Sequence, residues 1–319
     1  METTTYRALI IGCGNIGAFY DLNNHDILSH AKAYYENKLF NFSILDDDEI
    51  KTSIIKKKYN CFVEQSIDNL KKFNFISICT PTSTHYNYLT KCFSDKIPLV
   101  ICEKPISNNI NELNKLKKLY NKSDTKVIVN YFRQFHPSFI KLKSELQKYF
   151  STDNLIMINV RYHKGFLNNC SHAINLIEFL YDIEIKFSHF NITNINFDHF
   201  DDDPTITASG KSDNINFNLI GFNDIKYSIF EIDLIYANSM IKVQDSGNTI
   251  QYFVRSGKNQ NFPLPLVEKL KLKKTNAIFN RMKHVIKHSS HIYKHNLSDN
   301  FLKSLDLNIK MVNLLKNKI

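Results

Sequence analysis

The sequence is poor in glycine and arginine, and it has no tryptophan. Only 8 of its 319 residues are glycine. Its 6 cysteines form no Cys-x-x-Cys pair, which argues against a small disulfide scaffold and against a zinc ribbon. It has no run of 18 apolar residues that could form a transmembrane helix, and its first residues lack the layout of a secretory signal peptide. We therefore expect a cytoplasmic protein without a transmembrane segment.

The positive charge is concentrated in one segment near the carboxyl terminus. The chain carries 41 Lys and Arg against 31 Asp and Glu, a net charge of +10. Residues 255–295 contain ten Lys or Arg and one acid, and so account for +9 of that charge. The rest of the chain is close to neutral, which excludes a generally basic nucleic-acid binder. A hydrophobic content of 43% likewise excludes a disordered chain.

The first half of the sequence alternates short apolar runs with helical patterns, which are expected at 51–59, 85–93 and 111–120. Strands separated by helices of this length are typical of β–α–β units. Runs with little polar alternation suit strands that are covered on both faces. These residues therefore predict an α/β domain with a parallel sheet. The apolar runs are 6–11, 41–45, 73–79, 98–102 and 126–131.

The second half changes to longer segments with period-two alternation, which favours an antiparallel sheet. Helices are predicted here at 137–150, 171–181 and 299–315. Because the length suggests two domains, we expect one at 1–123 and an α+β domain at 124–319, with the last strand of the first sheet just beyond the boundary. The alternating segments are 155–162, 187–197, 214–220, 227–236 and 240–243.

The most specific short motif is Gly12-Cys13-Gly14-Asn15-Ile16-Gly17, which follows an apolar strand and opens a predicted helix. In this context the spacing predicts a dinucleotide-binding turn. The first glycine permits the tight turn, the second lets the backbone approach a pyrophosphate, and the third lets the helix pack on the strand. The amino terminus of the helix, which includes Asn15 and Ile16, offers N–H groups to the anion. The alternative is a glycine turn without a ligand.

An acidic residue follows the second predicted strand. Asp46 lies 29 residues after Gly17, whereas the expected offset is about 20; an inserted loop at 18–29 accounts for the excess. A carboxylate at this point accepts hydrogen bonds from a ribose 2′-hydroxyl and repels a 2′-phosphate, so we expect NAD rather than NADP. The acids at 46–48 could instead cap the following helix, and the two roles are compatible.

Three further stretches, together with the glycine motif, resemble the Gfo/Idh/MocA oxidoreductases, the glucose–fructose oxidoreductase and inositol dehydrogenase family. They are TPTSTH at 80–85, EKP at 103–105 and NYFRQFHP at 130–137. The resemblance is strong over residues 6–180 and weaker beyond them. It implies an α/β Rossmann domain with a parallel sheet, followed by an α+β domain with a large, mostly antiparallel open sheet. It also implies a homodimer or homotetramer formed through that second sheet.

The resemblance implies a catalytic lysine and a catalytic histidine. Lys104 matches the lysine beside the nicotinamide, where its charge can orient the substrate oxygen. Glu103 would hold this lysine or contact the cofactor. His172 matches a histidine at the start of a helix, whose imidazole can accept or return the hydroxyl proton. Such enzymes usually have an aspartate four residues earlier, where this chain has Asn168, which can hydrogen-bond but cannot carry charge.

The same resemblance implies further contacts with the cofactor and the substrate. Thr80, Pro81 and His85 are expected in the cofactor site. Arg133 is expected near the substrate, because a guanidinium suits a carboxylate or a phosphate; the alternative is a surface ion pair at a helix end. Lys164 is a weaker candidate for substrate contact.

The basic segment 255–295 is interpreted as one or two amphipathic helices. Its histidines at 284, 288, 291 and 295 have no accompanying acid or cysteine, so no metal site is predicted. Two interpretations stay open. The segment is either the solvated face of a helix that covers the sheet, or a surface for an anionic substrate, an acidic partner or a membrane.

The family resemblance, together with the predicted dinucleotide-binding turn, implies an NAD-dependent dehydrogenase or reductase that acts on CH–OH groups. The expected substrate is a secondary hydroxyl or ketone of a sugar or sugar derivative, with a nucleotide-sugar of surface-glycan biosynthesis as a refinement. One alternative is a catalytically weak NAD-binding regulatory protein, which the asparagine at 168 favours. Another is a hydrolase or lyase that uses tightly bound NAD for transient oxidation.

Overall fold

The computed structural model describes residues 5–149, 155–256, 266–272, 275 and 277–316. The chain divides into two compact units. Unit 1 comprises Met1–Phe135 and Phe279–Asn313, and unit 2 comprises His136–Ile278 and Leu314–Ile319. Each unit is built on its own β-sheet.

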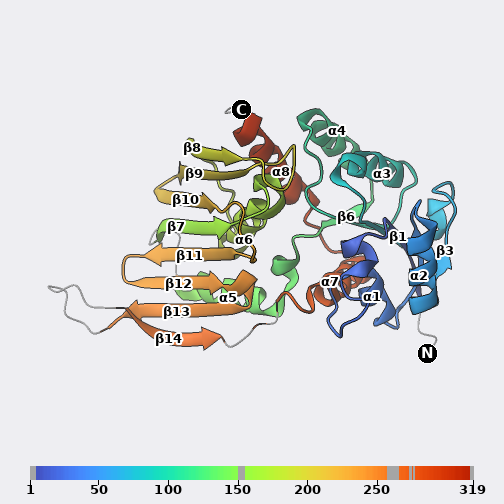
Figure 1. Ribbon diagram of the computed structural model, residues 1–319, viewed down its shortest axis with the longest axis horizontal. Helices are drawn as coiled ribbons and strands as arrows, with labels where there is room; N and C mark the ends of the chain where they lie inside the picture. The colour runs from blue at the N-terminus through green and yellow to red at the C-terminus, as the bar shows by residue number, and fades with distance from the viewer. Residues whose placement is uncertain (1–4, 150–154, 257–265, 273–274, 276, 317–319) are drawn as a thin grey trace. The chain divides into compact units, whose positions relative to one another are not determined.

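Unit 1 contains a six-stranded parallel sheet with the order β3-β2-β1-β4-β5-β6 (Figure 1). This is the order of a dinucleotide-binding Rossmann domain, so the predicted fold class is confirmed. Every residue of β4 and β5 is buried, which explains their continuous apolar sequences. The strands are β1 (Tyr6–Ile11), β2 (Phe40–Leu45), β3 (Phe62–Val63), β4 (Phe75–Ile78), β5 (Leu99–Cys102) and β6 (Lys126–Val129).

Helices cover this sheet. Residues of α1, α2 and α7 share one hydrophobic core with alternate strand residues such as Ala8, Phe42 and Phe75. The strand residues between them, Leu9 and Ile76 among them, are also fully buried, so the opposite face is covered as well. The helices of unit 1 are η1 (Asn15–Phe19), α1 (His30–Tyr35), α2 (Glu49–Tyr59), η2 (Leu70–Lys72), α3 (Thr82–Ser94), α4 (Ile110–Tyr120), η3 (Phe132–Phe135), α7 (Arg281–His295) and most of α8 (Phe301–Lys316).

The return of α7 and α8 to unit 1 differs from the division expected at 123/124. Helix α7 buries Met282, Val285 and Ile286 in the core of unit 1. Just before α8, the Asp299 carboxylate accepts a hydrogen bond from the backbone N–H of Val127 at 2.8 Å, and Asn300 makes similar bonds to Val129. These side chains hydrogen-bond to the backbone groups that β6 exposes at the outer edge of the sheet. The carboxyl-terminal segment therefore completes the first sheet rather than the second.

Unit 2 contains an eight-stranded sheet with the order β14-β13-β12-β11-β7-β10-β9-β8 (Figure 1). All neighbouring pairs are antiparallel except β7 and β10. The mostly antiparallel second sheet is thus confirmed. Its elements are α5 (Pro137–Tyr149), β7 (Leu155–Tyr162), η5 (Phe166–Cys170), α6 (Ser171–Tyr181), β8 (His189–Asn196), β9 (Thr205–Ser212), β10 (Ile215–Gly221), β11 (Phe230–Tyr236), β12 (Ser239–Gln244), η6 (Asp245–Gly247), β13 (Thr249–Arg255) and β14 (Leu266–Leu272).

The sequence suggested that the basic segment forms one or two helices. The structure shows that it does so only in part. Its first residue, Arg255, is the last residue of β13, and Leu266–Leu272 forms β14, which pairs antiparallel with β13. Among the described residues of the segment, only Arg281–His295 forms an α-helix, α7. Leu266 and Leu270 therefore belong to a strand, because alternation in 266–272 fits a sheet edge as well as it fits a helix face. Residues 257–265, 273–274 and 276 of this segment lie outside the described residues.

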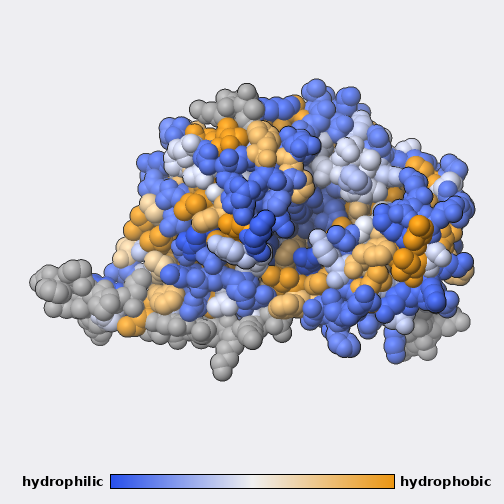
Figure 2. Space-filling view, in the orientation of Figure 1, coloured by the Kyte–Doolittle hydropathy of each residue, from blue (hydrophilic) through white to orange (hydrophobic). Residues whose placement is uncertain are grey.

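The visible surface is mostly hydrophilic, with small hydrophobic patches between charged side chains (Figure 2). Some large apolar side chains are well exposed, including Ile50, Phe62 and Tyr227. Scattered exposed apolar residues are normal for folded proteins. Among the described residues, no helix is both long and apolar enough to cross a membrane.

Candidate cofactor and active site

The glycine turn lies between β1 and η1. Gly12 has a φ of +93°, and a Cβ there would lie 2.8 Å from the backbone carbon of Cys79. A Cβ on Gly17 would overlap the carbonyl oxygen of Gly12. By contrast, a Cβ on Gly14 would meet nothing within 4 Å. Packing of the turn therefore requires Gly12 and Gly17, whereas Gly14 leaves open the space that a dinucleotide needs for close approach to the backbone.

The helix expected directly after this turn is the π-helical turn η1, and α1 begins only at His30, after the predicted insertion. In η1, Asn15 is exposed and Ile16 packs partly against the core. The insertion that follows is fixed by Asp21. Its carboxylate accepts hydrogen bonds from the N–H groups of Leu28 (2.5 Å) and Ser29 (2.7 Å), and from the Ser29 hydroxyl (2.6 Å). The insertion therefore delivers His30 in a defined position.

Asp46 follows the last residue of β2 and is tied to the glycine turn. Its Oδ2 accepts a hydrogen bond from the backbone N–H of Cys13 at 2.5 Å, and its Oδ1 accepts one from Asp48 at 2.9 Å. Asp48, not Asp46, caps α2 by accepting from the N–H groups of Ile50 and Lys51. Burial, and then the nearby Asp46 charge, raise the pKa of the Cys13 thiol to about 12. The carboxylate thus lies where it can meet a ribose hydroxyl beside the turn.

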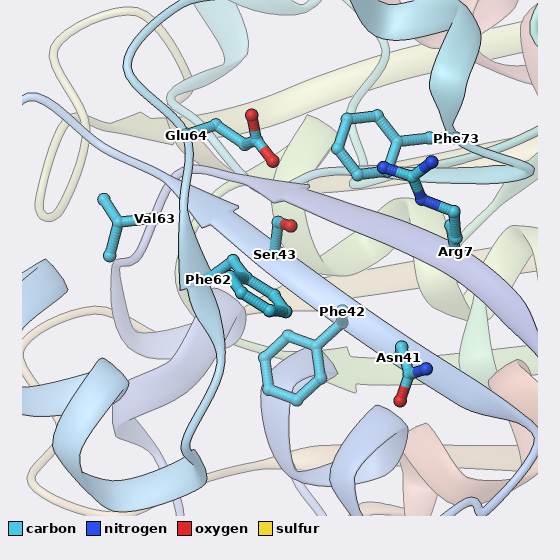
Figure 3. Close-up of a pocket in the computed structure, with 8 residues that line it drawn as sticks. All are labelled: Arg7, Asn41, Phe42, Ser43, Phe62, Val63, Glu64 and Phe73. Carbon is cyan, nitrogen blue, oxygen red and sulfur yellow. The ribbon is translucent and has the colours of Figure 1, made fainter.

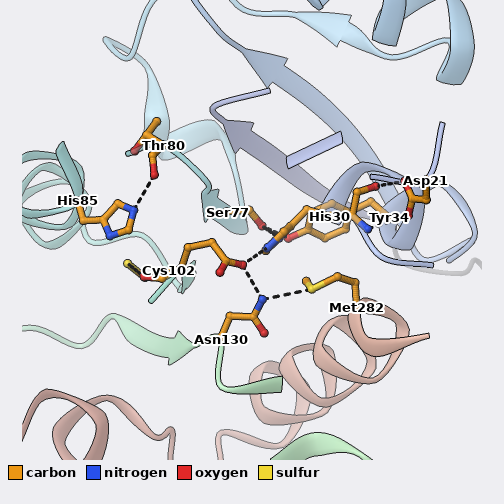
Figure 4. Close-up of polar contacts among 11 residues, drawn as sticks. Asp21, His30, Tyr34, Ser77, Thr80, His85, Cys102, Asn130 and Met282 are labelled. Atoms are coloured by element: carbon orange, nitrogen blue, oxygen red, sulfur yellow. Dashed lines mark hydrogen bonds and ion pairs between the residues drawn. The ribbon is translucent and has the colours of Figure 1, made fainter. Parts of the chain in front are cut away.

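Glu103, directly after β5, is buried and joins a set of hydrogen bonds whose members His30, Ser77, Tyr34 and Asn130 are labelled in Figure 4. Its Oε1 is 3.0 Å from His30 Nε2 and accepts a bond of 2.5 Å from Asn130 Nδ2. His30 Nδ1 is 2.9 Å from Ser77 Oγ, which is 2.8 Å from the Tyr34 hydroxyl. These contacts connect Tyr34 to Glu103 through Ser77 and His30.

The environment of Glu103 favours its carboxylate form. Burial disfavours the charge, but the hydrogen bond and charge of His30, the Asn130 amide and the charge of Lys104 outweigh it and lower the pKa of Glu103. Lys104 itself is partly exposed and follows this buried acid in the chain. The predicted lysine therefore stands beside a fixed negative charge.

Thr80 and Pro81 lie in the loop between β4 and α3, where the sequence predicted cofactor contacts. The His85 ring is buried beneath this loop: its Nε2 is 2.9 Å from the Thr80 carbonyl oxygen, and its Nδ1 is 2.9 Å from that of Pro105. Burial lowers the pKa of His85, and the two carbonyls oppose that shift. His85 therefore links the two loops that carry Thr80 and Pro105.

The predicted residues of unit 1 share one edge of the sheet. Gly12, Asp46, Thr80 and Glu103 follow the carboxyl ends of β1, β2, β4 and β5. In an open parallel sheet this edge is where ligands bind. Arg133 lies just beyond β6 in η3 and is buried, so the alternative of a surface ion pair is wrong.

In unit 2, the other predicted residues follow β7. Lys164 is exposed with a φ of +61°, Asn168 lies in η5, and His172 is the buried second residue of α6. Asn168 and His172 are four residues apart in consecutive helical turns, so they lie on one side. The backbone of η5 is held by Asp203, whose two oxygens accept hydrogen bonds from the N–H groups of Leu167 (2.7 Å) and Asn168 (2.8 Å).

Sequence reasoning did not single out His30, Ser77 or Asp203. Each acts through a partner that is distant in sequence, from 35 residues for Asp203 and Asn168 to 73 for His30 and Glu103. The only local signal for His30 is its place after Ser29, which caps α1 through the N–H of Lys32. Such a signal predicts a helix start, not a contact with an acid.

A cavity of about 430 Å³ also opens in unit 1, and Figure 3 shows the residues that line it. Arg7 and Asn41, which line it, stand near the beginnings of β1 and β2. Phe62 and Phe73 contribute aromatic rings, and Glu64 pairs with Lys72 at its margin. Because it lies toward the amino ends of the strands, this cavity is distinct from the predicted cofactor edge.

Comparison with known proteins agrees with the geometry of unit 1. Residues 6–131 match the model of the Gfo/Idh/MocA family, an oxidoreductase family with an NAD-binding Rossmann fold. These residues belong to that family. The protein therefore has an NAD(P)-binding oxidoreductase domain, and the resemblance stated from the sequence is confirmed. No curated protein sequence matches the chain significantly.

Solved structures share the fold over nearly the whole chain. UDP-N-acetylglucosamine 3-dehydrogenase from Acidithiobacillus ferrooxidans has a TM-score of 0.76 at 15% identity, over 98% of this chain and 96% of that one. A dehydrogenase from Clostridium difficile has a TM-score of 0.73 at 15% identity, over 98% and 99%. A myo-inositol dehydrogenase from Corynebacterium glutamicum has a TM-score of 0.70 at 16% identity, over 98% and 95%. At such identities the likeness concerns the fold.

Proposed function

We propose that the protein is an NAD-dependent oxidoreductase acting on a secondary hydroxyl or ketone of a sugar or sugar derivative, with a nucleotide-linked sugar as the more specific candidate. The observation that carries this proposal is the Glu103–Lys104 pair. A buried carboxylate held by His30 and Asn130 precedes a lysine at the same sheet edge as the glycine turn. This arrangement suits a reaction in which charge develops on a substrate oxygen.

The proposed roles follow from the chemistry of each side chain. When bound, the dinucleotide supplies the hydride acceptor or donor. The Lys104 ammonium orients the substrate oxygen and stabilises negative charge that develops on it. The His172 imidazole accepts the hydroxyl proton, or returns it in the reverse direction. Asn168, one turn before His172, positions these groups by hydrogen bonding without charge.

The cofactor preference is proposed from Asp46. A carboxylate held 2.5 Å from the Cys13 nitrogen supports binding of a ribose 2′-hydroxyl and disfavours a 2′-phosphate. Asp46→Ser should therefore weaken NADH binding and narrow the preference for NADH over NADPH. Fluorescence titration with both nucleotides measures this change. An unchanged preference would refute the role of Asp46.

The test of function is NADH formation or consumption, followed by absorbance with a panel of sugars and nucleotide-sugars. Lys104→Ala should lower kcat by about 10²-fold or more, as loss of a preorganised electrostatic group does elsewhere, while NADH still binds. Lys115→Ala is a matched control, because Lys115 is an exposed lysine of α4. Full activity in Lys104→Ala would refute the assigned mechanism.

Asn168 supports a second candidate, a catalytically weak NAD-binding regulatory protein. That candidate predicts NADH binding without turnover on any substrate. Asn168→Asp distinguishes the two, because a large gain in rate would indicate an enzyme that lacks one charge. Product formation without NADH accumulation would instead indicate a hydrolase or lyase. We also propose a homodimer or homotetramer formed through the unit 2 sheet, which light scattering of the purified protein tests.

A further inference from the structure

The cavity in unit 1 is built on one face of the sheet, across β1, β2 and β3 (Figure 3). In the register of the strands Arg7 pairs with Asn41, and Ser43 pairs with Phe62. Side chains alternate between the two faces along a strand, and paired residues share a face, so these four side chains lie on one side of the sheet. The volume of about 430 Å³ falls within the range of about 300–1,000 Å³ that is usual for small-molecule sites.

The polar part of the lining has hydrogen-bonding groups that the described residues do not use. Among those residues, neither the Arg7 guanidinium nor the side chains of Asn41 and Ser43 make a hydrogen bond. The backbone N–H of Arg7 donates to Asn74 Oδ1 at 2.9 Å, so the main chain is fixed while the guanidinium stays available. Ser43 is only 6% exposed and lines the cavity, so a ligand in the cavity can reach its hydroxyl. The cavity therefore offers a guanidinium, an amide and a hydroxyl to a ligand.

The charges that line the cavity favour an anion. Lys72 Nζ lies 2.5 Å from Glu64 Oε2, so these two charges are paired. Among the described residues, no carboxylate forms an ion pair with Arg7. Its guanidinium carbon lies 5.7 Å from the centre of the Phe73 ring, within the range of cation–π attraction. A carboxylate or a phosphate can bind such a guanidinium through two parallel N–H donors.

The aromatic part of the lining lies at a distance from this cation. The Phe62 ring is 73% exposed, and it borders the cavity. A planar ligand that stacks on this ring would cover it from water. Arg7 and Phe62 are two strands and two residues apart, which places their Cα atoms about 12 Å from one another at the usual strand spacing and rise. This separation suits a ligand with an aromatic ring at one end and an anionic group at the other.

We propose that the cavity is a second ligand site, which binds a planar aromatic molecule that carries a carboxylate or a phosphate. Arg7 binds the anionic group, and Phe62 stacks on the ring. Asn41 and Ser43 hydrogen-bond to polar atoms between them. The site lies near the beginnings of β1 and β2, whereas the glycine turn and Asp46 follow the ends of these strands. The ligand is therefore distinct from the cofactor, and the inference does not depend on the proposed function.

The proposal is tested by calorimetric titration of the full chain saturated with NADH, so that the cofactor site is occupied. The probes are indole-3-acetate and uridine monophosphate, and their neutral counterparts are indole-3-acetamide and uridine. At least one anionic probe should bind, and its neutral counterpart should bind about tenfold more weakly, because a charge-assisted bond is lost. If NADH does not bind, the proposed function fails, and the same titration without NADH still decides this inference.

Two variants separate the anionic and the aromatic contact, and both change exposed side chains, so both should fold. Arg7→Gln should weaken binding of the anion about tenfold and leave binding of its neutral counterpart unchanged. Phe62→Ala should weaken binding of both about fivefold or more, as loss of a stacking ring does elsewhere. NADH affinity should be the same in both variants as in the unchanged protein.

Lys58→Gln and Ile50→Ala are the matched controls, since they remove an exposed positive charge and an exposed apolar side chain from α2. Neither should change the affinity for the probes. Binding of neither anion, equal binding of an anion and its neutral counterpart, or unchanged binding in Arg7→Gln and Phe62→Ala would overturn the proposal. So would equal weakening by the controls, or probe binding that NADH abolishes, because the probe would then occupy the cofactor site.

Discussion

Two alanine substitutions in the glycine turn should have opposite effects on stability and on cofactor binding. A Cβ at Gly14 meets nothing within 4 Å, and the backbone there, with φ −73° and ψ −164°, suits any residue. Gly14→Ala should therefore change the free energy of unfolding by no more than about 0.5–1 kcal/mol. The added methyl occupies the space in front of the turn. We expect it to weaken NADH binding about tenfold or more, since a pyrophosphate could no longer reach the backbone.

Gly17→Ala, by contrast, should lower the free energy of unfolding. Its Cβ would overlap the Gly12 carbonyl oxygen, and this neighbour is backbone that cannot rotate away. Overpacking of this kind costs about 1–3 kcal/mol or more. In a unit of this size each kcal/mol lowers Tm by about 2–4 °C.

Urea denaturation gives the free energy of unfolding, and NADH fluorescence gives the dissociation constant at a temperature where both variants are folded. A Gly14→Ala variant that binds NADH as tightly as the unchanged protein would refute the reasoning. The open space in front of Gly14 would then not be where the dinucleotide approaches. A Gly17→Ala variant of unchanged stability would refute the packing argument.

Three further predictions concern the buried polar groups. His30→Ala should lower the free energy of unfolding by about 1–3 kcal/mol in urea denaturation, because buried Glu103 loses a donor, whereas His25→Ala, at an exposed position, should be neutral. Because the folded state lowers the pKa of Glu103, its contribution to stability is present above the unfolded pKa and is lost as the pH falls through the folded one. Stability measured from neutral into acidic pH should thus decline less steeply in Glu103→Gln. Gly165→Ala should cost about 2–4 kcal/mol in thermal or urea unfolding, since φ is +83° and a Cβ would overlap the Asp203 carboxylate.

The sequence predicted most of the fold because its signals are local. Continuous apolar runs mark β4 and β5, which are buried on both faces, and alternation marks β7, in which Ile158, Val160 and Tyr162 face the core. The glycine motif was located for the same reason, since its steric demands act within a few residues of the turn. The helix starts predicted at 137 and 171 also match the first residues of α5 and α6.

The domain division and the basic segment depended on information that is not local. No local pattern in residues 279–313 indicates that Met282 and Val285 pack on the first sheet. Nor does one indicate that Asp299 accepts a hydrogen bond from the backbone of β6. A helical apolar stripe predicts that a helix is buried on one side, but not against which sheet. Likewise, period-two and helical spacing overlap in short segments, so β14 could not be distinguished from a helix.

The asparagine at 168 shows the same limit at the candidate site, and with a chemical consequence. From the sequence, this position lacks the carboxylate that the family resemblance leads one to expect. In the structure a buried carboxylate is nevertheless present at this turn, because Asp203 binds the backbone N–H groups of Leu167 and Asn168. Its charge raises the pKa of the Cys170 thiol, secondary to burial, so its field extends to the residue two positions before His172. The loss of charge at 168 therefore does not make the turn before His172 electrically neutral, and Asn168 alone is weak evidence for an inactive protein.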